Sequence, residues 1–226
     1  MEHLSARTFN WIDDLRSGME AGTPSSAEEI SDVWQLKNGR TVEIRTAWPD
    51  DAPLMQALVR NLSLRSRYHR FFYPVHEMTP DMLARFTRAD PLDAVTLLAV
   101  IRENGKELAV GMAQYVAEPY PERGEFAVVV GDAWQHMGIA SRLLRNLVCM
   151  AWEAGIERIE GDVLSENWAM RQLLESMDFM LGPHPDGTYL FKAWKELALP
   201  TWKCAALAAF GAQRGRTTQP APGSRL

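Results

Sequence analysis

The sequence contains few cysteines and no long apolar segment. Its two cysteines among 226 residues, Cys149 and Cys204, are far apart and match no zinc-binding spacing. The sequence therefore suggests neither a disulfide framework nor a cysteine-based site, and we expect no metal. The longest apolar stretches are far shorter than the roughly 20 residues that span a bilayer. Because the N-terminus also lacks the apolar stretch of a signal peptide, we expect a cytoplasmic protein without a membrane partner.

The sequence also lacks an excess of positive charge. Its formal net charge is −5, which argues against a broadly basic nucleic-acid binder, so we expect no nucleic-acid partner. Hydrophobic residues make up 46% of the chain and charged residues 23%, as is ordinary for a globular protein. A chain of this length forms one domain with extensions or two small domains.

Composition divides the chain into three parts. Residues 1–35 mix charges with Ser, Gly and Pro, and we predict an N-terminal extension that is partly disordered or holds a short helix. Residues 36–196 alternate strand and helix patterns and form the predicted domain. Residues 197–226 end in a stretch rich in Arg, Gln, Thr, Pro and Gly, which predicts a flexible C-terminal extension.

Hydrophobic periodicity predicts an α/β (α+β) domain. Asn104-Gly105 separates two strand patterns and is typical of a type I′ hairpin turn. A hairpin-rich first half followed by a β-α-β crossover implies a mixed sheet with helices on both faces. The helices are expected to start near Pro49 and Thr79 and to cover about 138–154 and 167–177. The strands are expected near 41–45, 94–102, 108–117, 125–130, 156–164, 179–181 and 189–194.

The segment from Glu125 to Leu144 carries the strongest indication of a ligand site. A buried strand leads through a short loop into a long helix, whose first N–H groups and macrodipole favour a phosphate. Gly138 has no Cβ and lets a ligand approach the backbone closely. The residues alone leave two interpretations open, an anion site or a plain corner with a turn glycine, since the loop matches neither the P-loop nor the GxGxxG pattern.

Several motifs resemble those of the GNAT superfamily of acyl-CoA N-acyltransferases. Gln135-x-x-Gly138-x-Ala140 is similar to its Q/R-x-x-G-x-G/A signature, and Asn167-Trp-Ala-Met170 to its Asn-x-x-Ala segment. The resemblance covers about residues 42–194. In particular, NGRTVEIR at 38–45 and SLRSRYHRFF at 63–72 resemble segments of bacterial protein lysine acetyltransferases.

The resemblance implies a GNAT-like fold and acetyl-CoA as co-substrate. The fold would be a mixed, mostly antiparallel sheet of about seven strands around a central β-α-β cofactor-binding unit. The exposed backbone of Val128, Val129 and Val130 would bind the pantetheine arm, and Asn167 would contact that arm. Arg142 would reach the ribose phosphate or, equally, be a solvated helix residue. The pyrophosphate would be cradled by the amides of Gln135, His136, Met137, Gly138, Ile139, Ala140 and Ser141.

The resemblance also assigns Glu125 as the catalytic residue. A carboxylate half-buried among Phe126 and the valines has a raised pKa, which suits a general base that deprotonates the amine. The alternative is a strand-end glutamate that faces water. Leu174 occupies the position where many relatives have a tyrosine as general acid, so we assign no general acid.

The sequence therefore predicts an acetyl-CoA-dependent N-acetyltransferase that acts on a primary amine. By the subfamily resemblance, the acceptor is a protein lysine. Two alternatives stay open: a small-molecule amine as acceptor, such as an amino acid, polyamine or aminoglycoside, or a non-catalytic acyl-CoA-binding regulatory module. We interpret His69 as a surface residue. We expect packing and groove lining from the basic and aromatic cluster of Arg65, Arg67, Tyr68, Arg70, Phe71, Phe72 and Tyr73.

Overall fold

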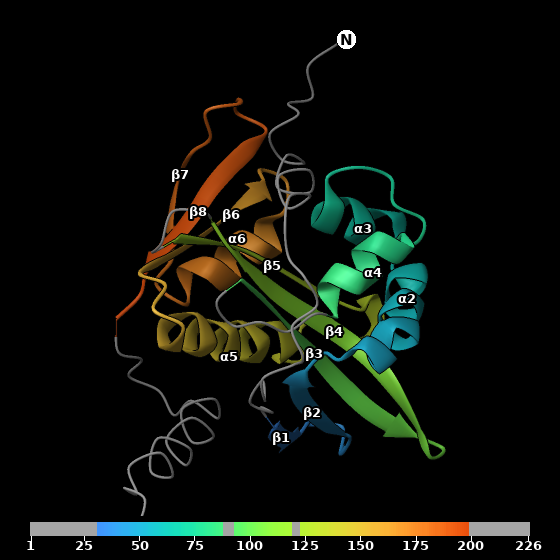
Figure 1. The fold of residues 1–226 in the computed structure, drawn as a ribbon. Coiled ribbons are helices and arrows are strands. Elements are labelled where there is room, and N and C mark those ends of the chain that lie inside the picture. The colour runs from blue at the N-terminus through green and yellow to red at the C-terminus, as the bar shows by residue number, and fades with distance from the viewer. Residues whose placement is uncertain (1–30, 88–92, 119–122, 199–226) are drawn as a thin grey trace, which may run out of the picture.

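The computed structural model describes residues 31–87, 93–118 and 123–198. In these ranges the chain forms one eight-stranded sheet in the order β1-β2-β3-β4-β5-β6-β8-β7, with five α-helices and two 3₁₀ turns (Figure 1). The predicted N-terminal helix and C-terminal tail lie outside the described residues. The strands are β1 (Ser31–Gln35), β2 (Thr41–Thr46), β3 (Ala94–Glu103), β4 (Lys106–Ala117), β5 (Arg123–Val130), β6 (Arg158–Leu164), β7 (Met180–Pro183) and β8 (Leu190–Glu196).

The helices mostly begin where the sequence signals predict. Thr79 caps α4 by accepting a hydrogen bond from the Met82 amide at 3.2 Å, and Pro80 is the first helical residue. The helices are α2 (Ala52–Asn61), α3 (Leu64–Phe71), α4 (Pro80–Phe86), α5 (Ile139–Glu153) and α6 (Trp168–Glu175), with 3₁₀ turns η2 (Pro49–Asp51) and η3 (Asp132–Trp134). None of these helices is long and apolar enough to cross a membrane.

The structure confirms the α+β class and corrects some of its details. The sheet has eight strands rather than about seven, because residues 31–35, predicted to be part of the extension, form β1 and pair with β2. The basic and aromatic cluster, for which the sequence analysis predicts no helix, contains helix α3. The β3–β4 hairpin is as predicted, with positive φ at both Asn104 and Gly105. Cys149 is buried on α5 and disulfide-bonded, contrary to the expectation, and the other cysteine lies outside the described residues.

The sheet separates two hydrophobic cores. On one face, α5 and α6 pack through Leu143, Leu147 and Leu174, and on the other, α2, α3 and α4 pack through residues such as Leu58 and Phe86 (Figure 1). Neighbouring residues of β3 alternate between the two cores, as the period of a strand requires. The helices therefore lie on both faces, as predicted.

A single parallel pair interrupts the otherwise antiparallel sheet. Strands β5 and β6, joined by α5, are parallel and pair at only three positions, from Arg123↔Arg158 to Glu125↔Glu160. All other neighbours in the sheet are antiparallel. Beyond Glu125, β5 keeps its pairing with β4 but leaves β6. The predicted β-α-β unit is therefore present, and its two strands diverge.

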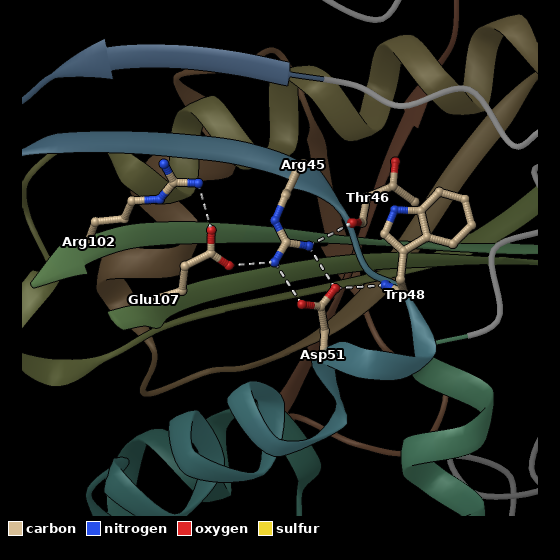
Figure 2. A network of polar contacts seen from close by, with 6 residues as sticks. All are labelled: Arg45, Thr46, Trp48, Asp51, Arg102 and Glu107. Carbon is tan, nitrogen blue, oxygen red and sulfur yellow. Dashed lines mark hydrogen bonds and ion pairs between the residues drawn. The ribbon is translucent and has the colours of Figure 1, made fainter. Parts of the chain in front are cut away.

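A buried ion-pair network fixes the start of α2 against the sheet (Figure 2). Arg45 on β2 donates two hydrogen bonds to Asp51, at 2.6 and 2.7 Å, and a third to Glu107 on β4 at 3.0 Å. The Trp48 amide donates to Asp51 at 2.8 Å. Burial alone would raise the pKa of Asp51, but the hydrogen bonds from Arg45 and Trp48 and the charge of Arg45 lower it overall. Both charges are thus satisfied in a largely desolvated position.

We predict that Asp51→Asn lowers the free energy of unfolding by about 2 kcal/mol or more, because Arg45 then loses its ionic partner inside the protein. The native pKa of Asp51 lies below its usual 3.8, so this stabilisation is present above that value and is lost as the pH falls through the native pKa. Denaturant unfolding at pH 7 and below 4 measures both effects. The control is Glu77→Gln in the exposed Arg60–Glu77 pair, which should change stability by at most about 0.5 kcal/mol. Equal losses in the two variants would contradict this role for the network.

Candidate active site

A cavity of about 780 Å³ lies where β5 and β6 diverge. Helices α3 and α4 contribute to its wall from one face of the sheet, and the N-terminal ends of α5 and α6 contribute from the other face. Most of the predicted site residues line this cavity. They are Glu125, Val128, Val129, Val130, Gln135, His136, Gly138, Ile139, Ala140, Ser141 and Asn167.

The divergence leaves one edge of β5 open. Val128 and Val130 remain in register with Ala113 and Gly111 of β4, whereas β6 offers no strand partner at this level. Immediately after the last paired position, a Cβ on Gly161 of β6 would lie 2.7 Å from the carbonyl oxygen of Phe126. A glycine is needed here because any side chain would push the strands apart one position earlier. The result is a gap flanked by backbone groups that an extended ligand can use.

The N-terminus of α5 closes one end of the gap with free amides. The first helical hydrogen bond across the loop is donated by Arg142 to the Gly138 carbonyl, so residues 136–141 donate no backbone hydrogen bond within the described part of the chain. Gly138 has φ +81°, and the space beside its Cα is open. This geometry fits a diphosphate held by N–H groups and the helix dipole.

Gln135 has a different part in the loop from the one predicted. Its backbone amide donates to Asp132 at 3.4 Å, so it is not among the free amides. Its side chain donates to the Val130 carbonyl and to the hydroxyl of Ser66 on α3, each at 3.2 Å. Asp132 in turn accepts from both Ser63 and Ser66. These bonds attach the loop to α3 and hold the end of β5 in place.

The structure does not bring Arg142 or Met137 to the cavity lining. The Nε of Arg142 donates to Asp32 of β1 at 2.7 Å, and its guanidinium lies 4.4 Å from the centre of the Trp34 ring. Asn146 also donates to Asp32, at 2.9 Å. Arg142 therefore holds α5 against β1 instead of pointing toward a ribose phosphate. No sequence pattern indicates this contact, because Asp32 lies 110 residues from Arg142.

Glu125 lies at the last paired position of β5 and lines the cavity. Burial and the negative charge of Asp162 raise the pKa of Glu125 to about 7, while the positive charges of Lys192 and Arg70 oppose the rise. No hydrogen bond occupies its carboxylate within the described part of the chain. A half-buried carboxylate that titrates near neutral pH can accept a proton from a ligand.

Helix α6 contributes its first turn to the cavity but offers no side chain there that could act as a general acid. Asn167 caps the helix by accepting from the Met170 amide at 3.3 Å, which leaves its side-chain NH₂ available at the cavity. Leu174 is fully buried in the core between α6 and the sheet. No tyrosine is among the described residues that line the cavity.

Three lining residues were missed or misread in the sequence. His69 was expected on the surface but lines the cavity, with its Nε2 3.3 Å from Glu166. Asp162 had no assigned role, although Glu160-Gly-Asp162 follows the strand period beside Glu125 and could have indicated it. Arg70 was assigned only to packing and groove lining. No cluster of three or more metal-ligating side chains occurs in the described residues.

Comparisons with known proteins show which family has this fold. A profile of the acetyltransferase (GNAT) family matches residues 59–179, more than half of the chain. An acetyltransferase of Pseudomonas aeruginosa is 28% identical over 154 residues, which cover 68% of this chain and 83% of that protein. Acetyltransferase Pat of Mycolicibacterium smegmatis is 27% identical over 144 residues, 63% of this chain. The match spans only 42% of the mycobacterial protein.

A solved structure shows the same architecture. The GNAT domain of S. lividans PAT superimposes with a TM-score of 0.66 at 26% identity, covering 78% of this chain and all of that domain. The fold and the site together define an acyl-CoA-dependent transferase. The chain belongs to the acetyltransferase (GNAT) family and is an acetyl-CoA-dependent N-acetyltransferase.

We predict that Gly138→Ala weakens acetyl-CoA binding several-fold, because a Cβ forces a left-handed residue to strain or shift the loop that presents the free amides. Gly155→Ala is the matched control, since Gly155 has φ +84° and open space at the other end of α5. Both variants should lose about 1 kcal/mol of stability, but only Gly138→Ala should change the dissociation constant. Calorimetric titration combined with thermal unfolding separates the two effects. Equal affinity in both variants would place the diphosphate elsewhere.

Proposed function

We propose that the enzyme transfers the acetyl group of acetyl-CoA directly to a primary amine, with Glu125 as general base. The observation that supports this most is the carboxylate in the divergence of β5 and β6, whose pKa is raised to about 7. An alkylammonium group has a pKa near 10.4 and cannot attack until it loses a proton. A base that is largely ionised just above pH 7 can remove that proton without being strongly solvated.

The proposed reaction needs from the protein the placement of both substrates and one proton transfer to Glu125. The activated acetyl group comes from the thioester of acetyl-CoA. Glu125 takes a proton from the ammonium, the amine nitrogen bonds to the acetyl carbonyl carbon, and the carbon–sulfur bond breaks. The second proton that the nitrogen loses as the amide forms passes to the leaving sulfur. The thiolate that leaves belongs to a thiol class with pKa near 8.5, which is a tolerable leaving group near neutral pH. This explains how the reaction can proceed with Leu174 in place of a tyrosine acid.

The acceptor that we propose is a lysine side chain of a protein. Support comes from the motif resemblance to bacterial protein lysine acetyltransferases and from the similarity to the GNAT domain of S. lividans PAT. Trp168 and Glu166 line the cavity and are more than 60% exposed. An acceptor that enters the cavity can therefore contact an apolar ring and a negative charge. A lysine side chain, with its apolar stem and cationic end, suits both.

We predict that Glu125→Gln lowers kcat by about 10² to 10⁴ while leaving the affinity for acetyl-CoA unchanged, because the free amides of α5 are intact. In the wild type, kcat/KM should rise with pH through about 7, since the base must be deprotonated to act. Steady-state kinetics between pH 5.5 and 9 measures both. The control is Glu103→Gln, an exposed residue paired with Arg40, which should behave as wild type. Unchanged turnover in Glu125→Gln would remove Glu125 as the base.

The acceptor class has its own test. With isotopically labelled acetyl-CoA and a cell lysate, we expect label in protein bands that peptide mapping assigns to lysine. Label in amino acids, polyamines or aminoglycosides instead would support the small-molecule alternative. Binding of acetyl-CoA without transfer to any amine in a broad panel would leave a non-catalytic acyl-CoA-binding module as the better description.

A further inference from the structure

Arg70 carries a positive charge that no contact in the described structure satisfies. It lies on α3, lines the cavity, and its Nε is buried without a hydrogen-bond partner. Within the described residues, no carboxylate oxygen lies within ion-pair distance of its guanidinium. Burial lowers the pKa of Arg70 to about 10, so the charge persists at neutral pH. A desolvated guanidinium with free donors is costly unless another charge balances it.

Aromatic packing fixes where this charge lies. The guanidinium carbon is 4.9 Å from the centre of the Phe71 ring and 5.5 Å from that of Phe86 on α4. Both rings belong to the buried core below α3 and α4. Stacking of this kind holds an arginine in one direction while leaving its N–H groups free. The side chain is therefore presented to the cavity by a rigid wall, not by a mobile loop.

Glu125 on β5 carries the opposite charge and lines the same cavity from another element. Neither Arg70 nor Glu125 is hydrogen-bonded within the described chain, yet each influences the other electrostatically. The other charges that act on Glu125 are Asp162 of β6, Lys192 of β8 and Glu118 after β4. Lys192 is itself paired with Asp162 at 3.2 Å, so its charge is already shared. This leaves Arg70 as the unshared cation among the described groups that act on Glu125.

We propose that Arg70 is a positioning residue for the catalytic base, holding the ionised Glu125 carboxylate oriented toward the acceptor from the opposite wall of the cavity. The two groups lie farther apart than ion-pair distance, so Arg70 acts on Glu125 through its charge and not through a direct contact. The proposal rests on the assignment of Glu125 as the base. This role also explains why an arginine occupies the position, since an apolar side chain could pack there without a buried charge.

The test removes the charge and keeps an unbranched, flexible side chain that can still pack against the aromatic rings. In Arg70→Met, the midpoint of the acidic limb of kcat/KM should rise by about one pH unit or more, since an opposite charge nearby lowers a carboxyl pKa by that amount. Arg70→Lys should restore most of the wild-type midpoint. Arg60→Met on α2 is the control, because Arg60 is exposed, paired with Glu77 and not among the residues that line the cavity. A uniform loss of rate at every pH, or a higher amine KM without a shift of the midpoint, would overturn the proposal.

A second readout does not depend on activity. The pKa of Glu125 lies above its usual 4.5, so the stability linked to its proton is present below that value and is lost as the pH rises through about 7. This loss can be measured without substrate. For the wild type and for Arg70→Met, the thermal stability of the protein is compared at each pH with that of the same protein carrying Glu125→Gln. In the Arg70→Met background, the loss should move upward by about one pH unit. An unchanged pH dependence of stability would refute the coupling between Arg70 and Glu125 even if Glu125 is the base. If the pH dependence shifts in Arg70→Met but Glu125→Gln is fully active, the coupling is supported and the assignment of Glu125 as the base is refuted.

Discussion

The divergence of β5 and β6 is the constraint on which the rest of the site depends. The two strands pair at three positions, and the last of them holds Glu125. Gly161 lets them stay close for one more position, after which β5 follows β4 and the backbone of 128–130 is open to the cavity. One gap thereby connects the free amides of α5 on one face of the sheet with the carboxylate on the other. A fully paired strand would separate the two.

The same gap sets the electrostatics of Glu125, the proposed base. Glu125 is desolvated because α3 and α4 cover its face of the sheet, and burial is the largest reason that its pKa rises. Cations on β8 and α3 limit the rise, so the group titrates near neutral pH instead of staying protonated. A carboxylate at this position on an ordinary antiparallel edge would face water and would be a weaker base. The raised pKa of Glu125 thus follows from where the strand pairing stops.

Sequence reasoning predicted the parts that depend on local patterns. The hairpin at Asn104-Gly105, the cap at Thr79 and the strand-loop-helix corner at Gly138 each have a local physical cause, and the structure has all three. It missed β1, whose five residues carry too short a pattern to distinguish from an extension. It also missed α3 as a helix, because its residues are mostly polar and only Ser66 and Phe71 are buried.

The remaining differences are contacts between residues far apart in the chain. Arg142, expected either to reach a ribose phosphate or to be a solvated helix residue, binds Asp32. His69, expected on the surface, lies beside Glu166, which is 97 residues away in the chain. No periodicity or motif encodes such pairs, since they arise only when helices and strands pack. For the same reason the family resemblance proposed Glu125 as the base, but no sequence pattern predicted the charges around it.

A crystal structure with coenzyme A tests the central claim most directly. The account predicts the diphosphate within hydrogen-bond distance of the amides around Gly138, and the pantetheine arm between the backbone of 128–130 and the diverging β6, with its sulfur directed toward Glu125. Coenzyme A bound on another surface, or the gap between β5 and β6 filled by side chains in the complex, would contradict it.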